Sequence, residues 1–250
     1  MNSRSKTAVT VGINSVRSAL KFGAEGVAEL WLDHGRRDRR LAELAALARA
    51  ADVVVRQVAR DELDRVADSG NHQGALAWVR MPAARNEQDL DRLLDTAEQP
   101  LLLVLDGVTD PHNLGACLRS ADGAGATAVI APKDKAVGLT PVAVKVASGA
   151  AESVPFVQVT NLARTLETLK ARGIWLIGLA DRAPATLFEI DLGGPIALVL
   201  GSEGSGLRRL TQERCDLLAS LPMHGRVESL NVSVATGICL YEVVRRRRSA

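Results

Sequence analysis

Polar and glycine residues gather in three segments of the C-terminal half of the chain. The first leads from a predicted strand into a predicted helix and contains Asn113, Gly115, Ala116 and Arg119. Asn113 could cap the helix, Gly115 and Ala116 would let another backbone approach closely, and Arg119 would lie about two turns inside. An ordinary capped helix with a surface arginine has the same pattern. This segment by itself therefore leaves a structural and a catalytic role open.

The second segment, Gly201 to Gly206, directly follows a predicted strand. Its glycines would free backbone N–H and C=O groups to contact the polar edges of a ligand. The G-x-x-G-x-G spacing differs from both the dinucleotide fingerprint and the Walker A loop, which argues against a standard NAD site. Glu203 would repel a pyrophosphate, so it favours a cationic or hydrogen-bond-donating ligand.

The third segment runs from Leu221 to Asn231 and precedes a predicted helix over 232–246. Ser229 and Asn231 occupy the position of a helix N-cap, which would be a structural role. Gly237 inside the helix costs about 1 kcal/mol relative to alanine, and close packing against another helix or a ligand loop would explain it. The arginines at 245–248 suit the negative end of a helix dipole, with an RNA contact as the alternative.

Continuous apolar runs after Pro100 predict the elements that position these segments. Runs bounded by Gly or Asp are typical of buried parallel strands, and helical patterns alternate with them. This alternation predicts an open parallel α/β sheet, whose ligands bind at the carboxyl ends of its strands. The predicted strands cover 101–105, 126–131, 174–179 and 196–200, and the predicted helices cover 114–124, 141–149, 162–172 and 207–217.

The N-terminal part has the pattern of a separate, small α/β unit. An amphipathic stretch carries Ile13, Val16 and Leu20, and it is followed by a predicted strand, helix and strand over 27–32, 41–51 and 53–58. The polar, acidic segment bounded by Pro82 and Pro100 resembles a linker that carries one helical piece. We therefore expect a domain over 1–80, a linker over 81–99 and a second domain over 100–250.

Composition excludes several classes of protein. The 250 residues are 47% apolar, 24% charged and 3% aromatic. This content rules out a disordered or collagen-like chain, and it offers too few rings for a surface that stacks single-stranded bases. The formal charge of +2 supports a polyanionic partner only weakly.

Cysteine usage and the apolar runs indicate a reduced, cytoplasmic protein without a metal site. Cys117, Cys215 and Cys239 have neither C-x-x-C spacing nor a histidine at ligand spacing, so we expect core thiols. The polar N-terminus lacks the apolar core of a signal peptide. Apolar runs are too short to span a membrane.

Taken in order, the three segments resemble the motifs of the SpoU family in the SPOUT superfamily of S-adenosylmethionine-dependent RNA 2′-O-ribose methyltransferases. The residues that carry the resemblance are 113–119, 198–207, and 221–223 with 228–238. The segments 12–16 and 71–74 resemble a ribosomal-protein-like substrate-binding domain found in some members. The runs 105–113 and 146–155 most resemble members that methylate a guanosine ribose in bacterial 23S rRNA.

The resemblance implies a fold and partners that periodicity does not reveal. It implies an α/β methyltransferase domain with a deep trefoil knot, a homodimer, and large-subunit ribosomal RNA as the substrate. S-adenosylmethionine would be held largely by backbone groups at Gly201, Leu221 and Leu230. The dimer interface would involve the C-terminal helices, where small residues near Gly237 would have a use.

The resemblance also implies catalytic roles. Arg119 would stabilise the developing 2′-alkoxide and a nearby phosphate, because a guanidinium with a pKa above about 12 is a poor general base. Asn113 and Asn231 would position that arginine or the ribose, with Glu203 and Ser229 in support. A 2′-hydroxyl as the acceptor requires RNA.

Other functions remain alternatives at this point. A Gly-loop oxidoreductase lacks support, because no acidic residue about 20 positions after the loop follows a second strand. A catalytically inactive rRNA-binding assembly factor would not need the polar residues named above. Within the enzyme class, the closest alternative is a SpoU enzyme that acts on tRNA or that modifies an antibiotic-resistance site in rRNA. The arginines at 36, 37, 39 and 40 form either a solvated turn or an RNA contact.

Overall fold

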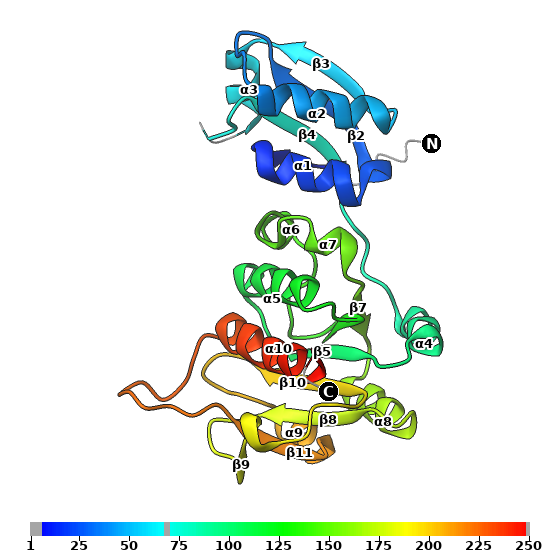
Figure 1. Ribbon diagram of the computed structural model, residues 1–250, viewed down its shortest axis with the longest axis vertical. Coiled ribbons are helices and arrows are strands. Elements are labelled where there is room, and N and C mark those ends of the chain that lie inside the picture. Colours follow the sequence, from blue (N-terminus) through cyan, green and yellow to red (C-terminus); the bar gives the residue numbers. More distant parts are fainter. Residues whose placement is uncertain (1–6, 68–70, 249–250) are drawn as a thin grey trace. The chain divides into compact units, whose positions relative to one another are not determined.

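The computed structural model describes residues 7–67 and 71–248, and the chain divides into two compact units, Met1–Ala83 and Ala84–Ala250 (Figure 1). The polar start of the chain, where we expect no signal peptide, lies partly outside the described residues. Each unit has its own sheet and its own core. The boundary between the two units, at Ala83 and Ala84, lies near the start of the expected linker over 81–99.

The described part of the first unit has a four-stranded sheet in the order β1-β4-β2-β3. β4 pairs antiparallel with β1 and β2, and β2 pairs parallel with β3. The strands are β1 (Thr7–Val11), β2 (Val27–Asp33), β3 (Val54–Val58) and β4 (Ala75–Arg80), and the helices are α1 (Ile13–Phe22), η1 (Ala24–Gly26), α2 (Arg39–Ala50) and α3 (Arg60–Ala67).

Helices cover both faces of this first sheet. Ala77 and Val79 of β4 share a buried cluster with α1 and α2, whereas Leu76, on the opposite face, packs with Leu63 of α3. Alternation of side chains along the strand explains this division. Both faces of β4 are therefore buried, and neither β4 nor α3 was predicted from the sequence.

The second unit has a parallel sheet, as the apolar runs predict. Its order among the described residues is β7-β6-β5-β10-β8-β11-β9, and every pair is parallel. The strands are β5 (Leu101–Asp106), β6 (Ala128–Pro132), β7 (Phe156–Val159), β8 (Trp175–Leu179), β9 (Ala185–Thr186), β10 (Ile196–Gly201) and β11 (Leu217–Ser220). The central strand β10 and its neighbour β5 therefore carry the first two polar segments at their carboxyl ends.

Two groups of helices cover the faces of the second sheet. Leu102 and Val104 of β5 pack in one cluster with α4 and α8, and α5 and α10 pack against each other on the other side (Figure 1). The helices are α4 (Glu87–Thr96), α5 (Pro111–Gly123), α6 (Pro141–Ala147), α7 (Ala150–Ser153), α8 (Leu162–Ala171), η2 (Leu187–Glu189), α9 (Arg209–Arg214) and α10 (Val232–Arg248).

Two expectations about the second unit need correction. The helix predicted over 207–217 is the short α9, after which Leu217 begins β11. The segment predicted as a linker carries a helix, as expected, but Leu90 and Leu94 of this α4 are buried in the core of the second unit. Its exposed acidic residues dominate the composition and conceal that apolar stripe.

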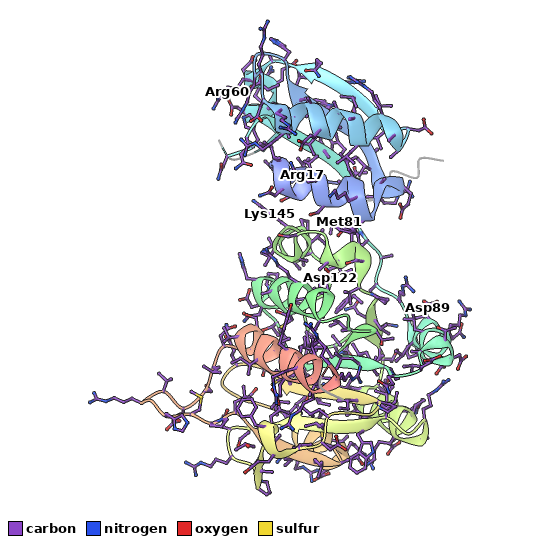
Figure 2. The ribbon with its side chains drawn as sticks, viewed as in Figure 1. Arg17, Arg60, Met81, Asp89, Asp122 and Lys145 are labelled. Atoms are coloured by element: carbon purple, nitrogen blue, oxygen red, sulfur yellow. The ribbon has the colours of Figure 1, made fainter. Side chains whose placement is uncertain are left out.

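Close helix packing explains the small residues of α5. A Cβ placed on Gly115 would lie 2.5 Å from the backbone oxygen of Ala143, so α6 approaches α5 too closely for a side chain there. This confirms the close approach predicted at Gly115. Gly237 of α10 faces Ser120 of α5 at an ordinary 3.7 Å. Asp122, farther along α5, accepts a hydrogen bond from Ser153 of α7 at 2.5 Å (Figure 2).

Candidate active site

A hydrogen-bonded cluster joins one residue from each of the three polar segments. Asn113 donates from Nδ2 to Oε1 of Glu203 at 3.2 Å, and Asn231 donates to Oδ1 of Asn113 at 3.0 Å. Asn231 also donates to the same Glu203 oxygen, which the backbone N–H of Val232 approaches at 3.4 Å. Segments 28 to 118 positions apart in the sequence therefore meet at one carboxylate.

Helix caps place two members of this cluster. Asn231 caps α10, because its Oδ1 accepts from the N–H of Ser233 at 2.9 Å, as predicted. Asn113 does not cap α5. Asp110 takes that role by accepting from the N–H of His112 at 2.9 Å, so α5 begins at Pro111. The earlier start turns the buried Asn113 side chain toward Glu203 instead of toward the helix end.

Glu203 lies in a loop with a narrow neck. A Cβ placed on Gly201 would lie 2.0 Å from the carbonyl carbon of Gly206, so only glycine permits this crossing. Inside the loop, Gly206 donates its N–H to the backbone oxygen of Ser202 at 2.9 Å. Side chains of Ser202 and Ser205 add a 2.6 Å hydrogen bond. The loop is therefore a compact turn that presents Glu203 at its apex.

A buried carboxylate anchors this loop to the neighbouring strand. Asp106, at the end of β5 and 1% exposed, accepts from Nε of Arg208 at 2.6 Å and from its backbone N–H at 3.0 Å. Nη2 of Arg208 completes an ion pair with the same carboxylate. Asp106 is also the residue of β5 that pairs with Gly201. Neither charged residue was predicted to have a role; an aspartate that ends a buried strand is the signal available in the sequence.

A cavity of about 250 Å³ adjoins the cluster. It is lined by the second and third segments together with the end of β8. All three residues predicted to hold the cofactor line it, namely Gly201, Leu221 and Leu230. Glu203 and Ser229 line it as well. The predicted cofactor-binding residues and two of the predicted catalytic residues therefore face the same cavity. None of the described lining residues is Lys, Arg or His, whereas Asp181, Glu203 and Glu228 are acidic.

Arg119 and Ser229 lie outside the hydrogen-bonded cluster. Arg119 is exposed on α5, about two turns from its start, and among the described residues its side chain has no hydrogen bond or ion pair. Ser229 is exposed at the cavity. The structure therefore brings Asn113, Glu203 and Asn231 together and leaves Arg119 available to a bound molecule.

The thiols take no part in this site. Burial raises the pKa of Cys117 to about 11 and the pKa values of Cys215 and Cys239 to about 12, so each is a neutral thiol near pH 7. In the part of the chain that the structure describes, no cluster of three His, Cys, Asp or Glu residues could hold a metal ion. The described helices also include none long and apolar enough to cross a membrane.

Both arginine clusters are largely engaged within the protein. Asp38 binds Arg36 and Arg40, and these guanidinium groups, Arg40 first, hold the pKa of its carboxyl at about 2. At the end of α10, Glu242 binds Arg245 and Arg246. Arg247 donates to the backbone oxygens of residues 99, 100 and 194. The arginines lie in the last turn of α10, as predicted, and these contacts engage three of them within the protein.

Protein-family models match both units of the chain. The model of the SpoU rRNA Methylase family matches residues 100–241, which hold the whole cluster and cavity. The model described as RNA 2′-O ribose methyltransferase substrate binding matches residues 9–84. The first match covers more than half of the chain.

Curated proteins and solved structures of this family resemble the chain over nearly its full length. The 23S rRNA (guanosine-2′-O-)-methyltransferase RlmB of Shewanella oneidensis is 53% identical over 98% of this chain and 99% of its own length. RlmB of Pseudomonas putida is 54% identical over 95% and 96%. The crystal structure of the SpoU methyltransferase AviRb from Streptomyces viridochromogenes with AdoMet has a TM-score of 0.79 and 29% identity, covering 99% of this chain and 93% of that one.

An AdoMet-bound rRNA methyltransferase from Sinorhizobium meliloti has a TM-score of 0.74 and 25% identity, covering 96% of this chain and 87% of that one. The family match, the identities and the matching folds all agree with the motifs that converge on Glu203. The chain belongs to the SpoU rRNA methylase family.

Proposed function

We propose that this protein transfers a methyl group from S-adenosylmethionine to the 2′-hydroxyl of a guanosine in 23S ribosomal RNA. The convergence of Asn113, Glu203 and Asn231 beside a glycine-lined cavity carries the proposal. The RlmB relatives, more than half identical over nearly the whole chain, supply the substrate.

The cavity suits S-adenosylmethionine. Its lining is acidic without a basic side chain, which complements the positive sulfonium and ammonium groups of that molecule. Backbone groups at Gly201, Leu221 and Leu230 would hold it, since bare backbone at these positions offers both donors and acceptors. When bound, the cofactor supplies an electrophilic methyl group for in-line transfer.

The protein's residues then orient the ribose and stabilise its charge. Arg119 would contact the 2′-oxygen, where negative charge develops, and a neighbouring phosphate. Glu203 holds the amides of Asn113 and Asn231 in fixed orientations, so these groups are ready to position the ribose without reorganisation. Ser229, at the cavity, supports the same site.

The chain path through the second unit supports a trefoil knot. After β10, the chain continues through α9 to β11, which lies beyond β8, and then returns as α10 against α5 and β10. The loop between β11 and α10, in orange, projects from the body of this unit (Figure 1). Gly201 lies against Gly206 and Leu207 where these segments cross. We infer that α10 is threaded through a loop formed by the preceding segments.

The first unit would hold the RNA, and two copies of the chain would form the enzyme. Residues 9–84 match the substrate-binding model, and Arg37 in its basic turn is exposed. For the dimer, α10 exposes Val234, Ile238 and Tyr241 at helical spacing, which is the surface that a second α10 would cover. We place this homodimer in the cytoplasm, where rRNA is modified.

Methyl transfer to defined RNA tests the function. The purified chain is incubated with tritiated S-adenosylmethionine and either an unmodified 23S rRNA transcript or a tRNA mixture. We expect label in a 2′-O-methylguanosine of the 23S transcript, detected as a nucleotide linkage that resists alkaline hydrolysis. Label on a base, label in tRNA alone, or no transfer would contradict the assignment.

A further inference from the structure

Lys135 has a backbone conformation that a lysine rarely adopts. It lies in the loop between β6 and α6 with φ at 56°, in the left-handed region. Residues other than glycine occupy this region mainly where the surroundings enforce it, often at functional sites. The conformation therefore raises the question of what the loop is built to present.

Hydrogen bonds fix this loop from both sides. The N–H of Lys133 donates to the backbone oxygen of Val159 at 2.9 Å, and the N–H of Val137 donates to that of Val108 at 2.9 Å. Lys135 lies between these two anchors. Its strained backbone thus belongs to a turn tied to the end of β7 and to the loop that follows β5.

The same turn touches the active-site loops. A Cβ on Gly107 would lie 3.8 Å from the backbone oxygen of Lys135 and 3.9 Å from Cβ of Ser202. Ser202 directly precedes Glu203, and Gly107 begins the loop that leads to Asn113. Three loops at the carboxyl edge of the sheet therefore meet within one residue of the catalytic cluster.

The charge of Lys135 is available at this edge. In the described structure the exposed Lys135 side chain has no hydrogen bond or ion pair, whereas Lys133 donates from Nζ to Thr160 at 3.4 Å. Asp134 beside it is exposed and forms no ion pair with it. Lys135 is also absent from the residues that line the cavity. Lys135 thus lies near the site but outside its cavity, where a ligand that extends beyond the cavity can reach it.

We propose that Lys135 binds a backbone phosphate of the RNA segment that carries the target ribose. This inference rests on the proposed function and names a substrate contact for it. A phosphate is the anion that an RNA brings to the mouth of the site, and a lysine binds it as a point charge. The carboxylate of the cofactor is the competing ligand, but that molecule would occupy the cavity, which Lys135 does not line.

The test compares Lys135→Gln and Lys135→Arg with the unchanged chain and with Arg92→Gln. Arg92 is an exposed cation on α4. This helix packs on the face of the sheet opposite to α5 and α6, so Arg92→Gln controls for the loss of one positive charge away from the site. KM for a 23S rRNA fragment and KM for S-adenosylmethionine are measured at several salt concentrations. Retained thermal melting temperatures would show that each variant folds.

We expect Lys135→Gln to raise KM for RNA roughly five- to tenfold at low salt. The slope of log KM against log salt concentration should fall by about 1, which corresponds to the loss of one phosphate contact. KM for the cofactor would stay the same, Lys135→Arg would restore RNA binding, and Arg92→Gln would change neither. A higher KM for the cofactor would assign Lys135 to that molecule instead. Unchanged RNA binding and salt slope would overturn the inference, while methylation by the unchanged chain would leave the proposed function intact.

Discussion

At the residue scale, Glu203 explains why the three segments must meet. One of its oxygens receives two side-chain amide groups and faces the N–H of Val232. An ionised carboxylate accepts such bonds more strongly than a neutral amide does. Without it, the Nδ2 group of the buried Asn113 would lose its acceptor, so the orientation of both asparagines depends on this carboxylate.

Arg119→Ala tests whether the guanidinium of Arg119 takes part in methyl transfer. Because Arg119 is exposed and has no partner among the described residues, we expect unchanged melting and unchanged binding of S-adenosylhomocysteine by calorimetry. Methyl transfer to rRNA should fall by a factor of about 100–1,000, corresponding to about 3–4 kcal/mol of barrier, if the guanidinium stabilises the alkoxide. A rate within a factor of three of the unchanged chain would remove Arg119 from the reaction.

At the element scale, the pair of Asp106 and Arg208 joins β5 to the loop that carries Glu203. Removing Arg208 would leave a carboxylate buried without its charged partner, at a cost of about 3–5 kcal/mol. Removing the charge of Asp106 costs less, about 1–3 kcal/mol, because half-exposed Arg208 can reach water. We therefore expect Arg208→Ala to be less stable than Asp106→Asn in urea denaturation, and both to bind S-adenosylhomocysteine more weakly.

The double variant provides the control for this pair. Once Asp106 is neutral, loss of Arg208 no longer strands a charge, so Asp106→Asn with Arg208→Ala should be more stable than Arg208→Ala alone. Additive losses in the double-mutant cycle would show that the two residues act independently.

Glu242 gives the end of α10 a dependence on pH. The guanidinium of Arg245, and then that of Arg246, hold the pKa of this carboxyl at about 2, below its ordinary 4.5. A pKa lowered on folding stabilises the protein above the unfolded value, and this contribution is lost as pH falls from about 4.5 toward 2. Glu242→Gln should therefore be less stable than the unchanged chain at pH 7, and the gap should narrow by pH 3. A constant gap across this range in urea titrations would contradict the ion pair's role.

Sequence patterns predict strands best where these are continuous apolar runs. The runs that became β5, β8 and β10 are continuous and apolar, and they are placed to within two residues. By contrast, β11 follows a six-residue helix directly, so its leucines continue a helical pattern. The motifs predicted Asn113, Glu203 and Asn231 as one site. The bonds of Asp106 to Arg208, 102 positions away, depend on a chain crossing that no local pattern encodes.

At the scale of the whole molecule, each of the two units has its own apolar core. The apolar clusters of the first unit and of the second share no residues among those described, and the connecting segment near Met81 lies between β4 and α4 (Figure 2). Residues 84–250 expressed without the first unit should unfold cooperatively and bind S-adenosylhomocysteine as the full chain does. Their kcat/KM for 23S rRNA should fall at least tenfold. Equal activity would show that the first unit is not needed to hold this RNA.

The exposed stripe on α10 allows a test of the proposed association of two chains. Val234, Ile238 and Tyr241 are 50%, 38% and 53% exposed on consecutive turns, a surface that a single chain leaves in water. We expect light scattering to give a dimer for the unchanged chain, and a monomer with little methyl transfer for Val234→Glu with Ile238→Glu, since two buried carboxylates would face the partner helix. Leu210→Glu changes an equally exposed apolar residue, 47% exposed on α9, and should remain dimeric because that helix lies on the other face of the sheet. Dimers of both variants would place the interface elsewhere, and an active monomer would show that one chain completes the site.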